Sequence, residues 1–129
     1  MKKKSRGRYD ISGLVEAQFG PGSRGRVLRN LLGIARVREM NSVETVALQS
    51  AMDSFFRRFD EEHRFTAQDI RDMHREWLGS IYAWAGEYRG VNVSKGDFVF
   101  AAAARVPALM RELEQDVLAV HAVQIPAAR

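Results

Sequence analysis

The three histidines of this 129-residue chain, His63, His74 and His121, are the side chains best suited to metal binding or proton transfer. A metal site on a helix needs a second ligand at a spacing such as His-x-x-x-His, and none of the three has one. His74 falls beside an apolar stripe that includes Trp77 and Leu78. A histidine in such a place is more often a satisfied, partly buried side chain than a ligand. The sequence therefore predicts no metal site.

Three carboxylates, Asp69, Asp72 and Glu76, share one face of an expected helix. Arg71 and Arg75 lie beside them, and mixed charges at these spacings are typical of a solvated helix surface. We therefore interpret the carboxylates as surface groups rather than as a catalytic pair.

Residues 91–100 have the pattern of a β-hairpin. Val91 and Val93 alternate with polar residues, and two phenylalanines flank Val99. Lys95-Gly96 lies where a two-residue loop needs a residue that tolerates positive φ, and Gly96 supplies it. Ser94-Lys95-Gly96 is too short for a phosphate-binding loop. A lone hairpin leaves its strand edges unpaired, so an edge must be covered or must take up a partner strand.

The rest of the chain predicts mainly helices. Apolar residues recur at three- and four-residue steps over residues 37–59, which indicates a long amphipathic helix. Thr66 caps a second helix, with Asp69 in a capping-box position and Gly86 as its stop. Pro107 fits the first turn of a third helix. A short helix is also expected over residues 26–32. The second helix would bury Ile70, Met73, Trp77, Leu78, Ile81 and Trp84, and the third would bury Leu109, Met110, Leu113 and Val117.

Several blocks of the sequence resemble one known family. Residues 82–89, Val93-Ser-Lys-Gly96 and Phe98-Val-Phe100 resemble the flap of Fic-domain proteins. Residues 9–19, 26–33 and 65–78 look like a bacterial branch of that family. The resemblance implies a mainly α fold, with a β-hairpin flap between two helices, and an activity that transfers AMP from ATP to a hydroxyl of a target protein.

The resemblance also implies a role for the hairpin. In proteins of this family the flap aligns a target segment by main-chain pairing and borders the nucleotide pocket. The docking element of this chain would then consist of the ten residues Val91, Asn92, Val93, Ser94, Lys95, Gly96, Asp97, Phe98, Val99 and Phe100. ATP and Mg²⁺ are implied for the complete family domain, and we expect neither to be bound by this chain alone.

The catalytic loop of the family, His-x-Phe-x-x-Gly-Asn-Gly-Arg, has no counterpart in the sequence. The chain contains no Gly-Asn-Gly, and His121-Ala-Val does not begin the motif. The resemblance therefore implies no catalytic residue here. We expect the N-terminal part of a Fic-like domain, without its later helices and inactive by itself.

Composition and charge limit the other possibilities. With 46% hydrophobic residues, no cysteine and no long apolar run, the chain is expected to be a single cytoplasmic domain without a membrane span. The basic leader, residues 1–8, carries five positive charges, whereas residues 39–129 carry ten bases against fourteen acids. Since the body of residues 9–129 lacks a strongly basic surface, the balance argues against a nucleic-acid partner.

Three functions remain open. The chain could be the N-terminal part of a Fic-type AMP transferase, an interaction module that docks a protein through its flap, or a nucleic-acid-binding protein that uses its basic arm. Without later helices, an apolar face would be uncovered and would recruit a protein partner, a completing segment or a second copy. The residues expected on that face are Trp77, Ile81, Leu109, Met110 and Leu113.

Overall fold

The computed structural model describes residues 10–11 and 18–121 of the chain. Its three α-helices are α1 (Val37–Arg58), α2 (Ala67–Leu78) and α3 (Val106–Leu113). Between α2 and α3 lie the strands β2 (Val93–Lys95) and β3 (Phe98–Val99), and β1 (Asp10–Ile11) pairs with β2. The fold is therefore mainly helical with a hairpin between two helices, as the sequence predicts. The basic leader and the last eight residues lie outside the described part.

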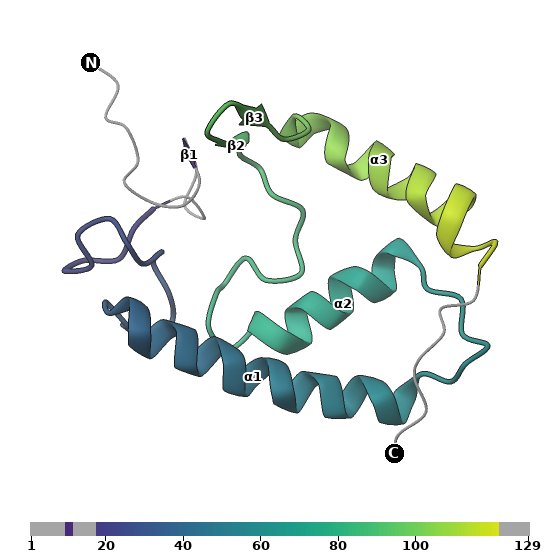
Figure 1. Ribbon diagram of the computed structural model, residues 1–129, viewed down its shortest axis with the longest axis horizontal. Coiled ribbons are helices and arrows are strands. Elements are labelled where there is room, and N and C mark those ends of the chain that lie inside the picture. The colour runs from purple at the N-terminus through teal and green to yellow at the C-terminus, as the bar shows by residue number, and fades with distance from the viewer. Residues whose placement is uncertain (1–9, 12–17, 122–129) are drawn as a thin grey trace.

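The core lies where α1 and α2 run side by side (Figure 1). Its members are the buried apolar side chains of Val27, Ile34, Met40, Leu78, Ile81, Tyr82 and Ala85. Two hydrogen bonds join Glu44 of α1 to α2 and to the turns that follow α2. The Trp77 indole N–H donates to its carbonyl oxygen at 2.9 Å, and the Tyr82 hydroxyl donates to its carboxylate at 2.8 Å. No helix in the described ranges has the length and apolar content that a membrane crossing needs.

The start of α2 confirms the predicted capping box. The backbone N–H of Asp69 donates to the Thr66 hydroxyl, and the Asp69 carboxylate accepts from the Thr66 N–H, each at 3.0 Å. These bonds satisfy donors that the first helical turn would otherwise leave unpaired. The carboxylate of Glu114 adds a third, since it accepts from the N–H of Ala67 at 2.6 Å.

The end of α2 differs from the prediction. The helix stops at Leu78 rather than continuing through Trp84 to Gly86. Gly79 and Ser80 are poor helix formers, and the chain beyond them continues as turns with hydrogen bonds between residues three apart, such as Ala85 N–H to Tyr82 C=O. Ile81 is still buried, so the apolar pattern is satisfied by turns rather than by a longer helix.

The short helix expected over residues 26–32 is also wrong. Leu28 instead pairs with Phe19 in an isolated β-bridge. The Asn30 side chain donates to the carbonyls of Leu28 and Ile34 and accepts from the N–H groups of Leu32 and Ile34. An asparagine that bonds to its own neighbouring backbone replaces the hydrogen bonds that a helix would use.

The third helix begins at Val106, close to the predicted start, with Pro107 in its first turn. A 3₁₀ turn at Ala103–Arg105 precedes it and a π-helical turn at Glu114–Leu118 extends it. α3 lies apart from α1 and meets α2 only near its end (Figure 1). Leu113 and Val117 are therefore 37% and 46% exposed, and their predicted burial is wrong.

Candidate functional site

The flap hairpin is anchored at its base and exposed at its tip. Val91 is buried, whereas Phe98 and Val99 are 64% and 74% exposed. In the register, Ser94 lies opposite Val99 and Lys95 opposite Phe98. The turn therefore consists of Gly96 and Asp97, one residue later than the Lys95-Gly96 loop predicted from the sequence. Gly96 has φ +58°, which suits the first position of a tight hairpin turn.

Two polar side chains hold the base of the flap. The guanidinium of Arg89 donates to the carbonyl of Val91 at 2.7 Å and also to the carbonyl of Ala101. The amide oxygen of Asn92 accepts from the N–H of Ala103 at 2.8 Å. Asn92, which the resemblance places in the docking element, is thus exposed and hydrogen-bonded at the base of the flap.

A cavity of about 460 Å³ lies against the base of the flap. Its volume falls in the range of small-molecule sites. The wall combines flap residues with residues from α2, the turns after it and the N-terminal loop. The lining residues are Leu28, His74, Trp84, Glu87, Tyr88, Arg89, Val91 and Val93.

His74 and Trp84 form the aromatic part of this wall. Their rings are stacked, with centroids 6.1 Å apart. The ring of Tyr82 also stacks on that of Trp84, with centroids 4.6 Å apart. Nδ1 of His74 accepts from the N–H of Gly86 at 2.8 Å, and burial lowers the pKa of His74. The neutral ring therefore carries its proton on Nε2. Because its Nδ1 is bonded to the backbone, the neutral ring has no free nitrogen that could accept a proton.

The other candidate groups are engaged elsewhere. Nε2 of His63 lies 2.9 Å from the carboxylate of Asp69, at the opposite end of α2 from the cavity. Although burial raises the pKa of Asp69, hydrogen bonds from His63 and Thr66 outweigh it and leave that pKa lowered. Arg71 and Arg75 both bind Glu87, each at 3.1 Å. Asp72 lies 3.9 Å from Arg75 and Glu76 lies 2.9 Å from Arg58, which agrees with the interpretation of these carboxylates as surface groups. The described residues contain no group of three or more metal-ligating side chains.

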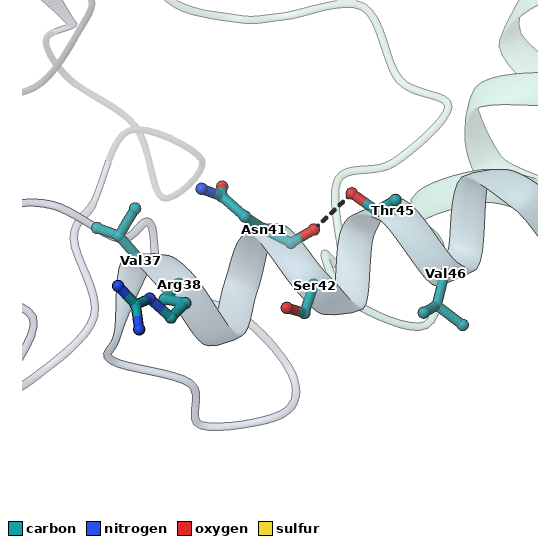
Figure 2. Close-up of a pocket in the computed structure, with 6 residues that line it drawn as sticks. All are labelled: Val37, Arg38, Asn41, Ser42, Thr45 and Val46. Atoms are coloured by element: carbon teal, nitrogen blue, oxygen red, sulfur yellow. Dashed lines mark hydrogen bonds between the residues drawn. The ribbon is translucent and has the colours of Figure 1, made fainter.

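A second hollow of about 660 Å³ follows the exposed side of α1 (Figure 2). All six of its lining residues, from Val37 to Val46, come from this one helix. Figure 2 shows Asn41 and Thr45 on one side of the helix and Val46 on the other, and the Thr45 hydroxyl donates to the Asn41 carbonyl at 2.7 Å. With no opposing wall among the described residues, this hollow is not a candidate site.

The family model described as Fic/DOC family matches residues 64–127. This part of the chain belongs to the Fic/DOC family. The matched range contains α2, the flap hairpin and α3. It therefore includes the hairpin that the sequence resemblance identifies as the flap. No curated protein matches the chain.

Sequence reasoning missed two parts of this site. Strand β1 was not predicted, because two residues are too few for a periodic signal and the lone hairpin carried the only strand pattern. The second is the cavity wall: His74 and Trp84 were interpreted as core, and both do pack in the interior while also lining the cavity. Because His74 lies twelve residues before its partner Gly86, no local sequence pattern indicates that it both packs in the interior and lines the cavity.

Proposed function

We propose that this chain is the flap-bearing part of a Fic-type protein adenylyltransferase and that it does not transfer AMP by itself. The observation that carries the proposal is the Fic/DOC match over residues 64–127, which includes an exposed hairpin beside a cavity. The hairpin would align a hydroxyl-bearing target segment. The cavity, with its aromatic wall of His74 and Trp84, suits a planar ring rather than a phosphate chain.

Transfer of AMP needs a base for the attacking hydroxyl, backbone N–H groups around the phosphates and a cation. The described residues do not fit the triphosphate of ATP or Mg²⁺. Nδ1 of His74 already accepts from the N–H of Gly86, and the guanidinium of Arg89 donates to two backbone carbonyls. The sequence also contains no Gly-Asn-Gly. These features support a non-catalytic role for the isolated chain.

The experiment is an AMP-transfer assay with the chain, labelled ATP, Mg²⁺ and a cell lysate as the source of targets. A matched reaction omits the chain. We expect the same labelling in both reactions. Labelling of a protein that depends on the chain would contradict the proposal and would indicate an unrecognised catalytic site in the chain.

A second candidate function is a protein-interaction module that docks a partner through the flap. The exposure of Phe98 and Val99 at the hairpin tip favours it, because large apolar side chains on a projecting tip need a covering surface. Proteins retained by the wild-type chain would be compared with those retained by the Phe98→Ser, Val99→Ser double variant. Retention that does not depend on these two side chains would contradict docking at the flap tip.

A further inference from the structure

One side of α1 carries a continuous row of exposed residues. They recur at steps of four, four, three, four and four residues, which keeps them on one side of an α-helix. The row consists of Val37, Asn41, Thr45, Leu48, Met52 and Phe56, all of which are exposed. Its spacing reads the same from either end of the helix.

The two halves of this row differ in shape. The first half, from Val37 to Thr45, lines the hollow of about 660 Å³ along α1 (Figure 2). The second half has three bulky apolar side chains, Leu48, Met52 and Phe56, with exposures of 37%, 39% and 51%. The row therefore begins at a hollow and ends in large side chains, and large side chains of one helix pack into hollows of another when two helices pair.

An antiparallel pair of two α1 helices would bring the unlike halves together. In the register that the spacing allows, Val37 lies opposite Phe56 of the second copy, Asn41 opposite Met52 and Thr45 opposite Leu48. The hollow then gains the opposing wall that it lacks within one chain. A parallel pair would instead place the bulky halves against each other and leave both hollows empty. It would also align the two helix dipoles, which is unfavourable.

The charges at the two ends of α1 favour the antiparallel orientation too. Arg36 and Arg38 are exposed at the start of the helix, and Asp60, Glu61 and Glu62 are exposed just after its end. An antiparallel pair places the start of each helix beside the end of the other, so a basic end meets an acidic end twice. Exposed ion pairs contribute little free energy. These charges therefore select the orientation, while apolar burial stabilises the pair.

We propose that this side of α1 binds a second copy of the chain and forms an antiparallel, two-fold symmetric pair of α1 helices. The partner is an identical chain because the row itself supplies both complementary shapes, and the two ends of α1 supply both signs of charge. In a two-fold pair every contact is made twice and neither half of the row is left uncovered, so the assembly closes as a dimer. The row contains no residue of the flap or of the cavity wall, so the dimer does not depend on the proposed AMP-transfer role.

Charge reversal at the ends of α1 tests the pairing. One variant carries Arg36→Glu and Arg38→Glu, and the other carries Glu61→Lys and Glu62→Lys. Each variant alone has like charges at both contacts, so its dimer dissociation constant should rise by about tenfold or more. In an equal mixture the two variants complement each other, and the constant should return to about the wild-type value. Light scattering coupled to size exclusion, over a series of protein concentrations, measures each constant.

The control reverses two charges on the other side of α1. Glu39 lies about two turns before Val46 and Arg57 about three turns after it, so both share the side of Val46, away from Asn41 and Thr45 (Figure 2). The variant with Glu39→Arg and Arg57→Glu should dimerise as wild type does. Far-ultraviolet circular dichroism of every variant checks that the helices remain.

Cysteine cross-linking tests the orientation, and the chain has no cysteine of its own. An equal mixture of the single variants Asn41→Cys and Met52→Cys should form disulfide-linked dimers under mild oxidation, because these positions face each other only in the antiparallel pair. Neither variant should link when it is oxidised alone. Linking of either variant alone would indicate a parallel pair and would overturn the inference. A monomeric wild type, or a mixture of the charge-reversed variants that does not dimerise, would overturn it as well.

Discussion

Nδ1 of His74 accepts a hydrogen bond from the backbone N–H of Gly86, with 2.8 Å between the two nitrogens. This bond connects α2 to the end of the turn region that leads into the flap. The imidazole therefore both links these two segments and forms part of the cavity wall. Its protonation state affects the stability of the fold as well as the chemistry of the cavity.

The free energy of unfolding should decrease as the pH falls below the ordinary pKa of histidine. Burial lowers the pKa of His74 in the folded state, so in that pH range the unfolded chain binds more protons than the folded one. The stabilisation is complete above the unfolded pKa and is lost as the pH falls toward the lowered folded value. Urea unfolding of wild type and His74→Gln at pH 7.5 and 5.5 would measure it. A wild-type decrease no larger than that of the variant would contradict this prediction.

Replacing Gly86 with alanine should destabilise the chain by more than about 2 kcal/mol. Gly86 has φ +84°, which costs an L-residue about 1–2 kcal/mol, and an added Cβ would lie 2.8 Å from Cβ of Arg75. Gly96→Ala is the matched control, because Gly96 also has positive φ but has no atom within 4 Å of the added Cβ. Urea unfolding should therefore show the larger loss for Gly86→Ala. Equal losses would mean that the neighbouring arginine moves away at no cost.

The contact between Glu114 and Ala67 should control how firmly α3 is attached. Glu114→Ala removes the acceptor of the Ala67 N–H, a loss comparable to that of a helix cap, about 0.5–2 kcal/mol. We expect faster amide hydrogen exchange at Ala67 and throughout α3. Glu112→Ala is the control, since Glu112 is exposed on the same helix. Unchanged exchange in Glu114→Ala would show that apolar contacts alone attach α3.

The sequence predicted the local chemistry of this fold better than its long-range pairing. The Thr66–Asp69 capping box and the glycine turn at Gly96 were predicted because each depends on side chains close in sequence. Strand β1 and the Glu114 contact join residues distant in sequence, so no local pattern encodes them. The loop around Asn30 was wrongly predicted as a helix because its side chain supplies the backbone with other partners.

The apolar face predicted from Trp77, Ile81, Leu109, Met110 and Leu113 is not exposed as a unit. Ile81 is only 1% exposed and the Trp77 indole donates to the Glu44 carbonyl, whereas Leu113 is 37% exposed. On α1, side chains at four-residue steps form a further exposed apolar stripe. The residues of this α1 stripe are Leu48, Met52 and Phe56, with exposures of 37%, 39% and 51%.

We expect the α1 stripe to drive self-association of the chain. Exposed apolar residues in a continuous row tend to be covered by a partner or a second copy. The Met52→Ser, Phe56→Ser double variant should therefore be smaller in solution than wild type, as measured by light scattering coupled to size exclusion. Val46→Ser, at an isolated exposed valine, should leave the size unchanged. A monomeric wild type would contradict the prediction.

Arg89 gives the flap a mechanical property. Because its guanidinium joins the carbonyls of Val91 and Ala101, the two legs of the hairpin are fastened together where they leave the domain. Because the two strands are held together at the base, we expect them not to separate from that end. The hairpin should instead move as one unit about the backbone just outside these hydrogen bonds. We therefore expect a displacement of the flap tip to move the whole hairpin rather than to separate its strands. Such a movement would reach the first turn of α3, which follows the hairpin in the chain.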